Sequence, residues 1–97
     1  MGRRENMGSL IVEHNANVGT ITQIDIHGGP TVPCNVINGG QTNPIDLPSG
    51  HYTATVTRIV DGTPITEDIT FDIFNNTDTI YTIGLPPGVS PIRRVEH

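Results

Sequence analysis

The chain has 97 residues, 34% of them hydrophobic and 15% charged, and this size allows one hydrophobic core and one domain. Its formal net charge is −5, there is no lysine, and four of the five arginines lie near the ends. Nucleic acids and anionic lipid surfaces require clustered cations, so the composition excludes both as partners. The longest apolar runs are too short to cross a bilayer, so we expect no membrane insertion. The single cysteine, Cys34, excludes an intrachain disulfide framework.

Both ends of the chain are predicted to be tails. Residues 1–8 are polar and show no apolar periodicity, and residues 87–97 follow the last predicted strand. The final Val95-Glu96-His97 resembles the start of a vector-encoded polyhistidine tag, so we expect no functional role for His97. The predicted domain therefore covers residues 9–86.

The central part of the chain is rich in β-branched residues, which favour strands over helices. Turns rich in Gly, Pro and Asn separate these apolar runs at the short, regular spacing that is typical of an antiparallel sandwich. In chain order the sequence predicts seven strands, near residues 9–14, 20–27, 31–37, 43–47, 51–60, 64–74 and 78–85. The predicted fold class is therefore all-β, a small antiparallel β-sandwich of about seven strands.

The second predicted strand breaks the alternation of apolar and polar residues. Ile24 and Ile26 share one face, whereas Ile21 points to the other. This pattern predicts either a bulge near Gln23 or a strand that is partly covered on both faces.

The fifth and sixth predicted strands alternate strictly, with apolar side chains on one face and threonines and aspartates on the other. Asp61-Gly62 between them predicts a tight hairpin turn, because glycine accepts the positive φ that the turn requires. The outward set is Thr53, Thr55, Thr57, Asp68, Thr70 and Asp72. Together with Phe74, the one aromatic residue not assigned to the core, it forms the predicted interaction surface. Such a face could dock an extended partner, a calcium ion or a regular lattice, and the alternative is an ordinary solvated surface.

The predicted core combines the inward residues of all seven strands. Its members are Leu10, Val12, Ile24, Ile26, Val32, Val36, Ile45, Leu47, Tyr52, Ala54, Val56, Ile69, Phe71, Ile73, Tyr81 and Ile83. Ile80 falls on the opposite face of the last strand and is expected to be exposed. A core of this size stabilises the fold by only a few kcal/mol after entropy is subtracted, so we expect assembly into a homo-oligomer.

One segment of the chain resembles part of a known group of β-sandwich domains. Residues 39–57 contain Ile-Asp-Leu-Pro-Ser-Gly-His-Tyr at 45–52 and an alternating Thr/Val strand after it. This stretch resembles prealbumin-like sandwich modules such as the PEGA and carboxypeptidase regulatory-like domains, with a looser match of strand spacing over residues 9–85. The resemblance implies that Leu47 plugs the core and that Tyr52 packs inward with its hydroxyl on a backbone group. It also implies a non-catalytic accessory module, often on exported bacterial proteins, and hence an extracytoplasmic location. It assigns no binding residue, because such families share a scaffold and not a site.

Several residues have side chains that could bind a metal or act as a nucleophile. His14, His27 and His51 could meet Asp25 or Glu13 around a divalent metal, and the alternative is a set of solvated loop histidines. Cys34 could act as a nucleophile if His27 or His51 folded beside it, and the alternative is a packed thiol. Ser49 lacks the frame of a nucleophile elbow and is predicted to be a turn residue.

These observations favour a module that is not an enzyme and has no cofactor or metal. The predicted function is protein–protein contact or self-assembly, through an exposed edge strand or the outward threonines and aspartates. The alternative function is binding of a carbohydrate or another cell-surface polymer. A third hypothesis is an enzyme built around the three histidines and nearby carboxylates.

Overall fold

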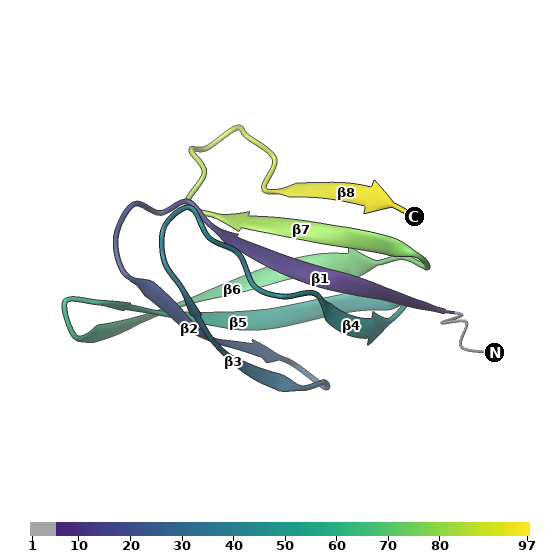
Figure 1. The fold of residues 1–97 in the computed structure, drawn as a ribbon, viewed down its shortest axis with the longest axis horizontal. Helices are drawn as coiled ribbons and strands as arrows, with labels where there is room; N and C mark the ends of the chain where they lie inside the picture. Colours follow the sequence, from purple (N-terminus) through teal and green to yellow (C-terminus); the bar gives the residue numbers. More distant parts are fainter. Residues whose placement is uncertain (1–5) are drawn as a thin grey trace.

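A computed structural model describes residues 6–97, which form eight strands and no helix. The strands are β1 (Met7–His14), β2 (Thr20–Ile26), β3 (Thr31–Val36), β4 (Ile45–Pro48), β5 (Gly50–Val60), β6 (Thr63–Ile73), β7 (Thr77–Ile83) and β8 (Ile92–Glu96). They form two four-stranded sheets that pack face to face (Figure 1). Sheet A has the order β4-β1-β7-β8, and sheet B has the order β3-β2-β5-β6. The predicted small all-β sandwich is confirmed, with one strand more than expected.

Most neighbouring strands are antiparallel, and β1 and β7 form a parallel pair in the middle of sheet A. All seven predicted strands are present, and each boundary lies within two residues of its predicted position. The part of the chain that the structure describes contains no helix long and apolar enough to span a membrane.

The core lies between the two sheets and follows the alternation of the strands. Thirteen of the sixteen predicted core residues are buried, and Val32, Tyr52 and Tyr81 are partly buried against them. Leu47 is 2% exposed, and the Tyr52 hydroxyl donates a hydrogen bond to the carbonyl oxygen of Pro48 at 2.6 Å. The Tyr52 ring also stacks on Phe71, with 5.7 Å between ring centroids.

A bulge in β2 explains the broken alternation of its sequence. The register of β2 shifts between Ile21 and Gln23 against both β3 and β5. The extra residue turns Ile21 to the same side as Ile24, and both side chains are fully buried in the core. Of the two interpretations of this strand, the bulge is the correct one.

The turn between β5 and β6 has the predicted form. Asp61 and Gly62 both have positive φ, 51° and 78°, as a two-residue hairpin turn of the primed type requires. Val60 and Thr63 are the facing residues that close the hairpin. The ends of both strands at this turn extend beyond sheet A in Figure 1.

The prediction that Ile80 is exposed was wrong, because its side chain is only 7% exposed. Ile80 does point to the outer face of sheet A, but it lies opposite Ile11 on β1 and Arg93 on β8. Ile11 is itself only 6% exposed. Ile80 is therefore flanked by these two residues and is buried on a face that alternation alone assigns to solvent.

The predicted tails need correction at both ends. Residues 92–96 form β8, which pairs with β7 from Thr77 to Tyr81, so the segment 87–97 is not a tail. β1 begins at Met7, two residues before the predicted start of the domain. Both segments are held by hydrogen bonding to strands from distant parts of the chain. Residues 1–5 of the predicted N-terminal tail lie outside the described residues.

Candidate interaction surface

The outer face of sheet B brings together six of the seven residues predicted as an interaction surface. β5 and β6 place Thr53 opposite Thr70 and Thr55 opposite Asp68. The other two members are Thr57, which lies opposite Thr66, and Asp72, which lies opposite His51. We call this set, Thr53, Thr55, Thr57, Asp68, Thr70 and Asp72, the Thr–Asp face. A two-residue turn fixes the register, so the local sequence suffices to bring these side chains together.

Thr55 is the centre of a hydrogen-bonded row that crosses three strands. Its hydroxyl donates to Oδ1 of Asp68 at 2.8 Å, and Nε2 of His27, at the end of β2, lies 2.9 Å from the same hydroxyl oxygen. Because that hydroxyl already donates to the carboxylate, it accepts from an Nε2–H of His27. On the other side of β2, the Thr31 hydroxyl donates to Asp25 at 2.9 Å. The row orients the Asp68 carboxylate, and the separate Thr31 hydrogen bond orients that of Asp25.

A second contact orders the other end of the Thr–Asp face. His51 and Asp72 face each other across β5 and β6, and Nδ1 of His51 lies 2.6 Å from Oδ1 of Asp72. Both side chains are largely exposed, so water screens this pair and its effect on stability is small. Its main consequence is the orientation of the Asp72 carboxylate.

Phe74 does not belong to the Thr–Asp face. It follows the end of β6, is 48% exposed, and lies under the guanidinium of Arg94, which is 4.8 Å from the ring centroid. Arg94 comes from β8 in the other sheet. One face of the Phe74 ring is therefore occupied by a cation.

The histidines and carboxylates considered as metal ligands do not converge. His14 is 1% exposed, so the expectation of a solvated loop histidine was wrong for this residue, and both of its ring nitrogens contact backbone groups. His27 and His51 are exposed on sheet B and bound to Thr55 and Asp72. Among residues 6–97, no three His, Cys, Asp or Glu side chains are placed to hold one metal ion.

Cys34 is a half-buried thiol on β3 that packs against the core. Its sulfur lies 3.5 Å from the carbonyl oxygen of Ile21, and burial raises the pKa of the thiol. Neither His27 nor His51, the two proposed bases, has a ring nitrogen bonded to it. The geometry matches the packed-thiol alternative.

Beside Cys34, a cleft of about 300 Å³ opens between β3 and the segment 41–45.

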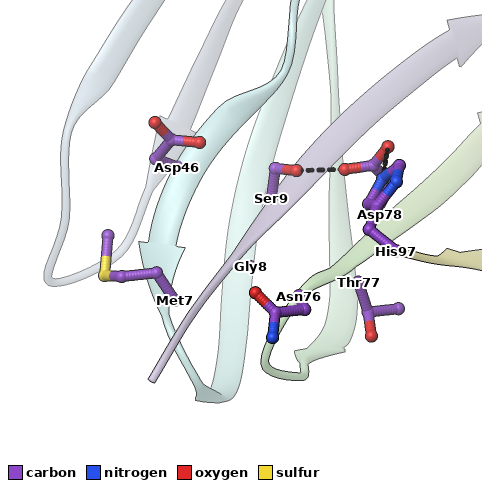
Figure 2. A pocket seen from close by; sticks show the side chains of 8 residues that line it. All are labelled: Met7, Gly8, Ser9, Asp46, Asn76, Thr77, Asp78 and His97. Carbon is purple, nitrogen blue, oxygen red and sulfur yellow. Dashed lines mark hydrogen bonds and ion pairs between the residues drawn. The ribbon is translucent and has the colours of Figure 1, made fainter. Parts of the chain in front are cut away.

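A Ser, an Asp and a His meet at the end of sheet A, around a hollow of about 130 Å³ (Figure 2). The Ser9 hydroxyl donates to one carboxylate oxygen of Asp78, and Nε2 of His97 lies 2.8 Å from the other. The Ser9 hydrogen bond, and then that of His97, hold the pKa of Asp78 below its usual value. A nucleophilic serine needs the imidazole as its direct base, whereas here the carboxylate separates the two groups. Ser49, the other serine considered, lies exposed in the turn between β4 and β5.

On the outer face of sheet A, an ion pair joins β8 to β1 across β7. Arg93 donates to both carboxylate oxygens of Glu13, at 3.0 and 2.7 Å, and the Thr82 hydroxyl donates to the same carboxylate at 3.0 Å. The Arg93 hydrogen bonds hold the pKa of Glu13 below its ordinary value. Sequence reasoning missed this cluster because Ile92-Arg93-Arg94-Val95 has no alternation that predicts a strand.

Comparison of the chain with protein-family models, with curated proteins and with solved structures gave no match.

Proposed function

We propose that this chain is a non-catalytic β-sandwich module that mediates contact with another protein chain through the Thr–Asp face and the open edge of strand β6. The observation that carries the proposal is the row centred on Thr55, in which the Thr55 hydroxyl, the Asp68 carboxylate and the His27 imidazole are already held in place. Preordered polar groups lose little side-chain entropy on binding, which favours recognition of a partner over a merely solvated surface.

The resemblance to prealbumin-like modules remains part of the proposal. The hydrogen bond from Tyr52 to the Pro48 carbonyl and the burial of Leu47 support the structural roles that the resemblance implies. An accessory role on an exported protein, and with it an extracytoplasmic location, follows from the resemblance alone.

Binding of a polysaccharide has weaker support. Sugar rings stack on exposed aromatic faces, and Arg94 covers one face of Phe74. The other three aromatic residues, Tyr52, Phe71 and Tyr81, are buried or partly buried between the sheets. If a glycan array nevertheless gives a hit whose affinity falls in Phe74→Ala, the polysaccharide hypothesis replaces ours.

The test is selection of random linear peptides, displayed on phage, against the native module. We expect binders whose affinity falls at least about fivefold in Thr55→Val, since this change removes the hydroxyl at the centre of the row with little change in side-chain shape. Ser90→Ala, in the loop before β8, is the control and should bind normally. Binders that are insensitive to Thr55→Val and protect no amide of β5 or β6 from hydrogen exchange would contradict the proposal.

The predicted homo-oligomer is tested separately by light scattering. A mass that rises from one chain toward two or more with concentration would support self-association. A mass of one chain at high concentration would refute it and leave another protein as the partner.

A further inference from the structure

The two sheets leave four strands at their edges in the described part of the chain, and these edges are not equivalent. β3 contains Pro33, β4 has four residues and ends at Pro48, and β8 has five residues. β6 has eleven residues, and its proline, Pro64, lies next to the hairpin turn. Proline lacks the N–H that an added strand would need, so β6 is the longest edge on which another strand can pair.

The hairpin geometry determines which backbone groups of β6 are open. Val60 and Thr63 close the two-residue turn as a hydrogen-bonded pair, and the bonding alternates along the strand from there. Thr66, Asp68 and Thr70 therefore direct their N–H and C=O groups away from β5. Within residues 6–97, no turn or loop forms a backbone hydrogen bond with any residue of β6. The next carbonyl, that of Asp72, accepts from the Thr79 hydroxyl at 2.9 Å, which marks the end of the open stretch.

The charges along this stretch argue against pairing between two copies of β6. Glu67 and Asp68 are exposed neighbours on opposite faces of the strand, and β6 carries no cation. Pairing β6 with a second β6 would bring these acidic residues together, and like charges on facing strands are destabilising. The single arginine of the hairpin, Arg58, donates to the carbonyl oxygen of Val18.

Strand β8 of a second copy is also a poor occupant. It is basic, but Arg93 is bound by Glu13 and Arg94 lies over Phe74, so both cations already have partners. An acidic open edge instead matches an extended segment of a different protein that carries lysine or arginine.

We infer that an extended, basic segment of a partner protein adds to sheet B as a fifth strand along Thr66–Thr70. This inference rests on the proposed function and names the partner of the same surface. The backbone of the added segment pairs with Thr66, Asp68 and Thr70. The lysines or arginines of the segment face Glu67 and Asp68. The neighbouring Thr–Asp face provides further polar contacts for side chains on the outer side of the added strand.

The experiment uses the peptides selected on the native chain. We expect binders enriched in Lys and Arg that protect the Thr66, Asp68 and Thr70 amides from exchange. Their affinity should fall roughly tenfold between about 0.1 M and about 1 M salt. The double variant Glu67→Gln with Asp68→Asn should weaken binding at least about fivefold, because it removes both charges while the new side-chain amide at position 68 keeps an acceptor for Thr55. Glu96→Gln on β8 is the control for loss of a carboxylate elsewhere.

The backbone contribution is tested at Thr66. Thr66→Pro removes the outward N–H, as Pro64 does two residues earlier, whereas Thr66→Ala keeps it. We expect binding to be lost in Thr66→Pro and retained in Thr66→Ala, with both variants shown to be folded by their thermal transitions.

The outcomes separate this inference from the proposed function. Binders that depend on Thr55 and protect β5 or β6, but are not basic or are insensitive to salt, would overturn the basic partner and leave the proposed function intact. Equal binding by Thr66→Pro and Thr66→Ala would overturn strand addition. Self-association that Thr66→Pro abolishes would identify a second copy as the occupant instead. Failure to select any peptide that depends on the surface would count against both proposals.

Discussion

Nε2 of His14 lies 2.9 Å from the carbonyl oxygen of Gly19, at the far end of the loop that joins β1 to β2. Nδ1 of the same ring lies 3.1 Å from the backbone nitrogen of Ala16 and accepts its hydrogen. The proton of the neutral ring is therefore on Nε2, which donates to Gly19. The buried imidazole ties both ends of the loop to the end of β1.

His14→Ala should therefore lower the free energy of unfolding by about 2–4 kcal/mol, because it leaves a cavity and two backbone groups without partners. Urea unfolding measures the change. His14→Gln keeps a donor for Gly19 and His14→Asn keeps an acceptor for Ala16, so each should cost less than His14→Ala. If all three variants cost the same, the two hydrogen bonds do not contribute to stability.

The Glu13–Arg93 pair predicts a pH dependence of stability. Arg93 lowers the pKa of Glu13 in the folded protein below its ordinary value of 4.5. A group whose pKa is lower in the folded state stabilises the fold fully above its unfolded pKa. This contribution is lost as the pH falls below 4.5 and through the folded-state pKa. Replacing Glu13 by Gln should cost about 0.5–1 kcal/mol at neutral pH and almost nothing at strongly acidic pH.

Urea unfolding of the native protein and of Glu13→Gln across this pH range measures the difference. Glu96→Gln removes an exposed carboxylate from β8 and serves as the control for net charge. A stability difference between the native protein and Glu13→Gln that does not shrink in acid would contradict the assignment.

Two glycines with positive φ should respond differently to alanine. Gly62, in the hairpin turn, has φ of 78° and open space where a Cβ would lie, so Gly62→Ala should cost about 1 kcal/mol. Gly84 has φ of 94°, and a Cβ there would lie 2.5 Å from Cα of Ala16. Gly84→Ala should therefore cost roughly 3 kcal/mol or more, since backbone would have to move. Thermal and urea unfolding of both variants provide the comparison, and equal costs would refute the close approach of Gly84 to Ala16.

Cys34 should be a slow thiol in the native protein. Burial raises its pKa from the ordinary value of 9.0, so less reactive thiolate is present at neutral pH. We expect an aromatic disulfide reagent to modify Cys34 at least about tenfold more slowly in the folded than in the urea-unfolded chain. Faster reaction in the folded state would revive the hypothesis of a nucleophile.

The outward set on β5 and β6 was predictable because its geometry is local. Alternation assigns Thr55 and Asp68 to one face, and the turn at Asp61-Gly62 fixes which residues face each other. The bulge in β2 was predictable as one of two interpretations, because Ile21 and Ile24 are both apolar but out of phase. In each case the information lies within a single strand or a single hairpin.

The Thr55–His27 contact, the burial of His14 and the strand β8 were not predictable in this way. His27 reaches Thr55 only because β2 pairs with β5, which places together two residues that are 28 apart in sequence. His14 is covered by the loop that follows it and by the segment around Gly40, whose carbonyl accepts from its backbone nitrogen. Residues 92–96 have no alternation and become a strand because β7 offers them an edge.

Short-range patterning alone thus determined an all-β chain, seven of its strands, the hairpin, and which side of that hairpin is polar. The assembly of the two sheets decided the rest: which edges stay open, which histidine is enclosed, and where carboxylates meet their donors. The physical reason is that side-chain direction follows from neighbouring φ and ψ angles, whereas burial and pairing depend on segments that meet only after the chain has folded.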